Sequence, residues 1–120
     1  MAAPRLVKVQ SPEELIIRVT TAIVLKRPIL AVYENLPRSL CPHVIGWNKQ
    51  RELRVLCYQY GGMSSSGLGP KRSPLNWRCL SVTKLKDVQW LTDGWESGEQ
   101  HSRTQSCIEE VLLDTEKLPD

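Results

Sequence analysis

The sequence predicts a mainly β domain of the α+β class, in which one N-terminal helix precedes a five-stranded antiparallel small barrel or strongly bent sheet. The chain has 120 residues, which is about the length of one domain. One stretch near its start has the apolar spacing of an amphipathic helix. Five short segments rich in β-branched and aromatic residues then follow, and polar turns separate them.

The predicted helix begins at the sequence Ser-Pro-Glu-Glu of residues 11–14. Ser11 suits the capping position, Pro12 suits the first helical position, and Glu14 completes a capping box. Pro28 requires the helix to end just before it. Apolar residues recur on one face of this segment, at Leu15, Ile16, Val19, Ala22 and Ile23. We expect that face to pack on the following sheet; the alternative is a partner protein or a second subunit.

The five predicted strands are the segments 29–33, 43–47, 53–60, 77–82 and 88–91. Residues 48–51 resemble a hairpin turn. Residues 61–76 are rich in Gly, Ser and Pro, which favours a flexible loop or, alternatively, a loop whose backbone N–H groups close over an anion. Residues 94–106 are polar and predict a loosely held segment. Residues 108–113 form either a strand or a helix, because their periodicity does not separate the two.

Basic and acidic residues are unevenly distributed along the chain. Residues 1–90 carry 14 Lys and Arg against 5 Asp and Glu, whereas residues 91–120 carry 2 against 8. We therefore expect an N-terminal segment (1–10), a helix-plus-sheet domain (11–93) and an acidic tail (94–120). A basic body favours an anionic ligand or nucleic acid as partner. The tail is either solvated or folded over the basic surface, and two independently solvated faces are an equal alternative.

The stretch from Leu15 to Leu25 is too short and too polar to cross a bilayer, and the start of the chain lacks the pattern of a secretory signal. We therefore expect no membrane partner, a cytoplasmic location and reduced cysteines. Four cysteines lie far apart in the sequence, at positions 41, 57, 79 and 107, which favours buried free thiols. A metal held by Cys41 and His43 is the alternative, but no second ligand pair accompanies them, so we predict no metal and no cofactor.

One series of features is similar to a known family. Tyr33 lies on the first strand, Arg38 precedes the Pro42-His43 pair, the segment 55–58 forms the second strand of a hairpin, and the segment 78–85 closes the series. In this order the features resemble the WYL domain family over roughly residues 29–91.

The resemblance implies an Sm-like five-stranded barrel with a helix. It also implies a ligand-sensing module for nucleotides or short nucleic acid, of the kind found in bacterial regulators of transcription and defence. WYL regulators usually carry a helix-turn-helix domain as well, whereas only 28 residues precede the sheet here. A recognition helix needs a supporting helix to set it in the major groove, so we expect no sequence-specific recognition of duplex DNA by this chain.

The candidate ligand-binding residues combine cations with aromatic and amide groups. Guanidinium groups bind phosphate with two parallel hydrogen bonds, and aromatic rings stack on bases. Each of these residues has a structural alternative: a solvated strand face for the cations, a hydrogen-bonded position for the histidine, and core packing for the tyrosines. The candidates are Tyr33, Arg38, His43, Arg54, Tyr58, Gln59, Arg78 and Lys84.

No motif for catalysis is found. The sequence lacks a nucleophile elbow and an H-E-x-x-H zinc motif, and the carboxylates Glu34, Glu52 and Asp87 of its basic body are scattered, with no obvious catalytic pair. We therefore expect a non-enzymatic module that senses a nucleotide or short single-stranded nucleic acid, acting as a homodimer or through a regulatory partner protein. The alternative is a protein–protein interaction scaffold, and a small hydrolase or nuclease is a minor third reading.

Overall fold

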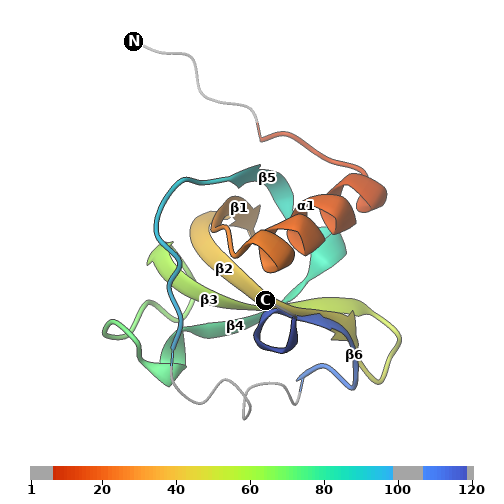
Figure 1. The fold of residues 1–120 in the computed structure, drawn as a ribbon. Coiled ribbons are helices and arrows are strands. Elements are labelled where there is room, and N and C mark those ends of the chain that lie inside the picture. Colours follow the sequence, from red (N-terminus) through yellow and green to blue (C-terminus); the bar gives the residue numbers. More distant parts are fainter. Residues whose placement is uncertain (1–6, 99–106, 119–120) are drawn as a thin grey trace.

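The computed structural model describes residues 7–98 and 107–118, and it consists of one α-helix and a six-stranded antiparallel sheet (Figure 1). The mainly β class is therefore confirmed. Within the described residues the strand order is β4-β3-β2-β1-β5 with β6 beside β2, so the sheet stays open instead of closing into a barrel. The elements are α1 (Pro12–Leu25), β1 (Ile29–Tyr33), β2 (Leu36–Trp47), β3 (Leu53–Gly62), β4 (Trp77–Ser81), β5 (Lys86–Trp90) and β6 (Glu110–Asp114), with 3-10 helices at Pro74–Asn76, Val82–Lys84 and Thr115–Lys117.

Helix α1 begins as the sequence predicts. The Ser11 hydroxyl accepts a hydrogen bond from the backbone N–H of Glu14, and the helix ends at Lys26 in a left-handed conformation. The predicted apolar stripe packs on the sheet, except that Ile16 lies at its edge and stays partly exposed. Within residues 7–98 and 107–118, no helix has both the length and the apolar composition that a membrane span requires.

Strand β2 is longer than predicted, because it starts at Leu36 and not at His43. Proline lacks an N–H group and is uncommon inside sheets, so Pro37 and Pro42 concealed the first half of the strand. Pro42 lies at a register shift, where the ladder between β2 and β3 skips one residue. The first half of β2 pairs with β1, the second half pairs with β6, and most of its length pairs with β3.

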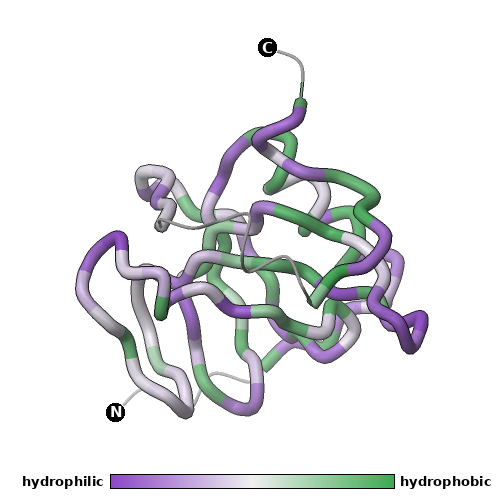
Figure 2. The backbone as a smooth tube through the Cα atoms, turned by 90° about the horizontal axis from the view of Figure 1, so that it is seen from below, coloured by the Kyte–Doolittle hydropathy of each residue, from purple (hydrophilic) through white to green (hydrophobic). Residues whose placement is uncertain are grey.

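The sheet buries a different core on each face. We call the side that packs against α1 the helix face; it carries Val55 and Cys57 of β3 together with Leu15 and Val19 of α1. The opposite side, the outer face, carries a smaller cluster of Cys41, Val44, Leu56, Tyr58, Trp77 and Ile108. Hydropathy along the chain follows this arrangement, since hydrophilic residues concentrate at turns on the rim of the molecule (Figure 2).

The segment 107–118 belongs to the sheet. The segment contains strand β6. The sequence left open whether these residues form a strand or a helix, and the structure shows a strand. β6 approaches β2 closely at Gly46, where any side chain would collide with the backbone carbonyl of Glu110. The Thr115 hydroxyl donates a hydrogen bond of 2.9 Å to the carbonyl of Ile23 in α1. The sequence predicts a loosely held segment over residues 94–106. Residues 99–106 of this segment lie outside the described residues.

The prediction of four reduced thiols was wrong for two cysteines. Cys79 of β4 and Cys107 form a disulfide, with a Cα–Cα distance of 6.5 Å. Wide separation in sequence suggested free thiols, but the sheet brings the two residues together on its outer face. Cys41 and Cys57 are free and buried, as expected. Within the described residues, no group of three or more His, Cys, Asp or Glu side chains is placed to hold a metal.

Candidate ligand-binding site

Arg38 is a charged residue within the sheet and only 3% exposed. It lies on β2 opposite Ala31 of β1 and Gly62 of β3, so its side chain shares the helix face with the apolar core. Gly62 has a left-handed backbone (φ 81°), and a side chain there would clash with Pro37 and with the Arg38 backbone. The close approach of β3 at this glycine therefore places backbone over the base of the arginine.

The guanidinium of Arg38 has few partners for a buried cation. Its Nη2 donates to the Tyr33 carbonyl at 3.4 Å and to the Glu34 carboxylate at 3.2 Å. Its Nε is buried and has no hydrogen-bond partner within the described residues. A buried donor without a partner costs about 1–3 kcal/mol, and more in a charged group. The cost makes this guanidinium a candidate for binding an anion.

The negative charge that pairs with Arg38 belongs to Glu34, which lies in an unusual turn. Glu34 and Asn35 connect β1 to β2, and both have left-handed backbones, with φ of 53° and 63°. A two-residue hairpin of this kind normally prefers Asn or Gly at such positions, because other side chains are strained there. The Glu34 side chain is 65% exposed, so the ion pair joins a buried cation to a solvent-facing carboxylate. The Tyr33 ring lies beneath the guanidinium, 5.2 Å from it.

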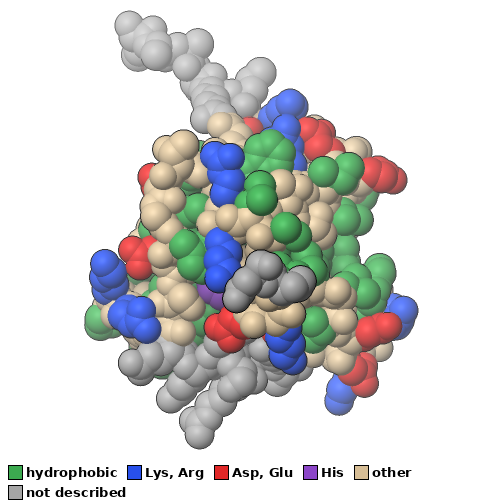
Figure 3. All heavy atoms as spheres, in the orientation of Figure 1, with side chains coloured by type: hydrophobic (Ala, Val, Ile, Leu, Met, Phe, Trp, Pro, Cys, Tyr) green, Lys and Arg blue, Asp and Glu red, His purple; other side chains and the backbone are tan. Residues whose placement is uncertain are grey.

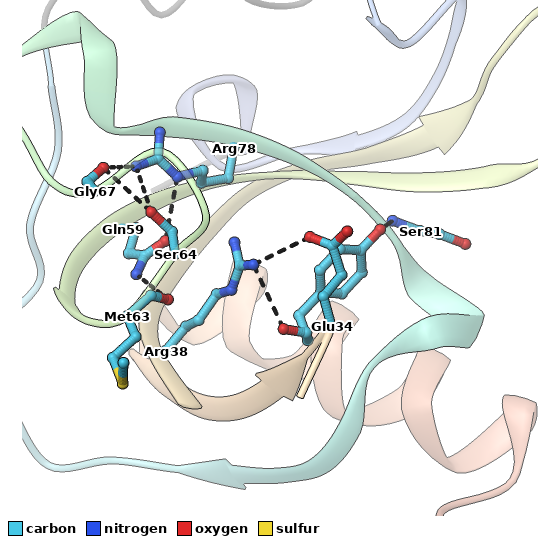
Figure 4. A network of polar contacts seen from close by, with 9 residues as sticks. Glu34, Arg38, Gln59, Met63, Ser64, Gly67, Arg78 and Ser81 are labelled. Carbon is cyan, nitrogen blue, oxygen red and sulfur yellow. Dashed lines mark hydrogen bonds and ion pairs between the residues drawn. The ribbon is translucent and has the colours of Figure 1, made fainter. Parts of the chain in front are cut away.

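Arg78 lies on the same face of the sheet as Arg38, but its hydrogen bonds form a separate set (Figure 4). Its Nε donates to the Gln59 amide oxygen at 3.2 Å, and Gln59 is fully buried. Its two terminal nitrogens donate to carbonyl and hydroxyl oxygens of β4 and of the residues before it. Those acceptors are Ser64 Oγ at 3.3 Å, Gly67 O at 2.7 Å, Leu75 O at 2.6 Å and Trp77 O at 3.3 Å.

All five N–H donors of Arg78 are thus used within the chain, and most of them hold the loop formed by residues 63–76. Gln59 contributes from the other side, because its amide nitrogen donates to the carbonyls of Gly61 and Met63. Burial lowers the pKa of Arg78, and the like charge of Arg38 lowers it further. Arg78 therefore anchors this loop and also adds positive potential beside Arg38.

The structure brings four of the eight candidates together: Tyr33, Arg38, Gln59 and Arg78. Tyr33 completes the group through its hydroxyl, which accepts a hydrogen bond of 3.1 Å from the backbone N–H of Ser81. Sequence reasoning missed Glu34, although an acidic residue four positions before Arg38 was a usable signal for an ion pair.

His43 and Tyr58 lie on the outer face instead. The His43 ring contacts Trp77 and Trp95, with ring centroids 4.8 and 4.7 Å away. Its Nδ1 lies 2.7 Å from the Cys41 carbonyl and its Nε2 lies 3.2 Å from the Ser97 hydroxyl. The Tyr58 hydroxyl donates to the Ser73 carbonyl and accepts from the Asn76 amide. Both residues are buried in an aromatic cluster, on the far side of the sheet from Arg38.

Arg54 and Lys84 are also separate from this group. Arg54 pairs with Gly46 and Ser81 near the start of β3, and it lines a cavity on the outer face. Lys84 lies exposed in a 3-10 helix between β4 and β5. The candidate site is therefore smaller than predicted: a helix-face cluster of Tyr33, Glu34, Arg38, Gln59 and Arg78, which we call the Arg38 cluster.

No family model, curated protein or solved structure matches this chain. The resemblance to the WYL family therefore stays a prediction. The geometry of the Arg38 cluster, taken by itself, indicates a cationic site that is incompletely neutralised within the described residues.

Proposed function

We propose that the chain is a non-enzymatic binding module whose Arg38 cluster binds a nucleotide or a short single-stranded nucleic acid as a regulatory ligand. The observation that carries this proposal is the buried, unpaired Nε of Arg38 beside a solvent-facing carboxylate. The predominance of basic residues over positions 1–90 supports an anionic ligand. The order of features that resembles the WYL family supports the choice of nucleotides.

A phosphate group would replace the Glu34 carboxylate at Arg38. Arginine offers Nε and one terminal nitrogen as a fork that fits two phosphate oxygens, so a phosphate would satisfy the donor that now lacks a partner. Glu34 is exposed and leaves this position without disturbing the core. Entry of the ligand requires the neighbouring loop of residues 63–76 to shift, and this loop contributes no side chain to either core cluster.

The first test compares Arg38→Gln with Arg51→Gln by fluorescence anisotropy, using labelled oligonucleotides and a nucleotide panel at low salt. Arg51 is a matched control, because it is an exposed arginine that also pairs with one glutamate, Glu110. We expect binding that weakens as salt rises, is lost in Arg38→Gln and is retained in Arg51→Gln. Equal binding by both variants, or no binding by the unaltered chain, would contradict the proposal.

A second test uses the internal carboxylate. Glu34→Gln removes the anion that competes for Arg38 while keeping the shape of the side chain. We expect this variant to bind the same ligand more tightly than the unaltered chain and to gain more thermal stability from it. Weaker binding by Glu34→Gln would show instead that the carboxylate helps to hold the ligand.

A protein-interaction scaffold is a second candidate function, and the surface of α1 favours it. Ile17, Val24 and Leu25 are more than half exposed on this helix. Hydrophobic atoms gather over α1 on the face seen in Figure 3. Light scattering during gel filtration distinguishes the candidates. Self-association that resists salt and disappears in Val24→Asp supports the scaffold, and a monomer at all concentrations contradicts a scaffold that acts through a second copy of the chain.

The cytoplasmic location stays a prediction, and one observation weighs against it. Structural disulfides are rare in the cytosol, where thiols are kept reduced, yet Cys79 and Cys107 are bonded. Rapid denaturation of the cells in acid, followed by alkylation of the unfolded protein, decides the question. Two alkylated cysteines indicate an oxidising compartment, and four alkylated cysteines indicate the cytosol.

A further inference from the structure

A second arginine has an unpaired donor, on the opposite face from Arg38. Arg54 lies near the start of β3, and its Nε is buried without a hydrogen-bond partner within the described residues. These two arginines hold both of the buried, unpartnered side-chain nitrogen atoms found in residues 7–98 and 107–118. Because a buried donor without a partner is costly, Arg54 calls for a binding explanation separate from that of the Arg38 cluster.

Arg54 lines a cavity of about 330 Å³, whose walls come from three parts of the chain. The turn between β2 and β3 contributes one wall and is held by Asn48, whose side-chain oxygen accepts from the N–H groups of Gln50 and Glu52. A second wall is the segment after Cys107, joined to β4 by the disulfide and to Trp47 by a backbone hydrogen bond from Glu109. The lining residues are Asn48, Lys49, Gln50, Arg54, Cys107 and Glu109.

The charges of this lining restrict the ligand. Lys49 and Arg54 are cationic and Glu109 is anionic, which leaves one net positive charge beside the amide groups. A single carboxylate or phosphate group in the cavity would pair with the terminal nitrogens of Arg54 and with Lys49, and its negative charge would offset part of the cost of the buried Nε. A chain of phosphates would meet repulsion from Glu109. The cavity therefore differs in charge from a groove that binds a nucleic-acid backbone.

From this arrangement we infer that the Arg54 cavity is a second binding site, for a small molecule that bears one carboxylate or phosphate group. The site does not depend on the ligand proposed for the Arg38 cluster, since the two arginines lie on opposite faces of the sheet. The disulfide ties one wall of the cavity covalently to β4, which limits the movement of that wall.

The test is a nuclear magnetic resonance titration of the ¹⁵N-labelled chain with acetate and, separately, with inorganic phosphate, at constant ionic strength set by chloride. The Nε–Hε signal of Arg54 should shift in a saturable way, together with the backbone amides of residues 48–50 and Glu109. A response to acetate alone identifies a carboxylate ligand, and a response to phosphate alone identifies a phosphate ligand. An Arg54 signal that moves with neither anion would overturn the inference.

Variants assign the effect to the cavity. Lys49→Gln changes an exposed side chain, so it should fold normally, and it should weaken the saturable shift of Arg54 several-fold. Arg54→Gln should abolish the shifts at residues 48–50. Arg51→Gln, outside the cavity lining, should leave the titration unchanged. Arg38→Gln should do the same, which separates this site from the first. An unaltered titration in both Lys49→Gln and Arg54→Gln would refute the assignment.

Discussion

Replacing Arg78 by methionine tests whether this residue anchors the loop of residues 63–76. Methionine keeps an unbranched apolar stem like that of arginine and removes all five donors. The Gln59 oxygen is then left buried without its partner, at a cost of about 1–3 kcal/mol. The carbonyls of Gly67 and Leu75 take up water instead, because their bonds to Arg78 lie in exposed positions. We therefore expect the free energy of unfolding to fall by about 2 kcal/mol.

Urea denaturation measures this loss, and hydrogen exchange measured by mass spectrometry locates it. Residues 64–76 should exchange faster in Arg78→Met while α1 keeps its protection. Arg51→Met is the control, since an exposed ion pair contributes about 0–1 kcal/mol. In a double-mutant cycle, Gln59→Leu and Arg78→Met should be less destabilising together than the sum of the single changes. Unchanged stability with unchanged exchange in the loop would refute the role given to Arg78.

Three other predictions follow from burial and from the disulfide. Leu15→Ala should lower the free energy of unfolding by about 2–5 kcal/mol in urea denaturation, whereas Ile17→Ala, at an exposed position, should change it little. Replacing Cys79 and Cys107 together by serine should cost roughly 2–4 kcal/mol and make the melting temperature insensitive to reducing agent; a melting temperature that still falls with reductant would contradict this. Burial raises the pKa of the Cys41 thiol to about 12, above its usual 9.0, so native protein should react slowly with thiol reagents at pH 8. Its contribution to stability, present at neutral pH, should decline above pH 9, where the unfolded thiol ionises; a pH titration of stability tests this.

The fold was predictable where local chemistry determines it. Ser11 and Pro12 mark the start of α1 without any knowledge of its surroundings, and the strand segments follow from β-branched and aromatic residues. The first half of β2 was not predictable, because it contains Pro37 and Pro42 and proline is uncommon inside sheets. The turn at Glu34 was also concealed, since its left-handed backbone carries neither glycine nor the usual Asn-Gly pair.

The candidate site was predictable only in part, for a reason that the strand geometry explains. Successive side chains of a strand point to opposite faces, so Tyr58 and Gln59 could not both face one ligand. Applying this alternation to the sequence would have separated them. The unpaired Nε of Arg38 and the full set of bonds made by Arg78 depend on loop positions, and no local pattern reveals those.

Strand β2 has a consequence for the order in which the chain assembles. Segments β1, β2 and β3 are consecutive and joined by short turns, so they meet early at low entropic cost. β6 comes from far along the chain, so we expect it to complete the edge of β2 beside residues 44–47 after the first three strands have met. Until then this edge would offer free N–H and C=O groups to any other extended chain. We therefore expect newly synthesised protein to be most exposed to aggregation before β6 has paired.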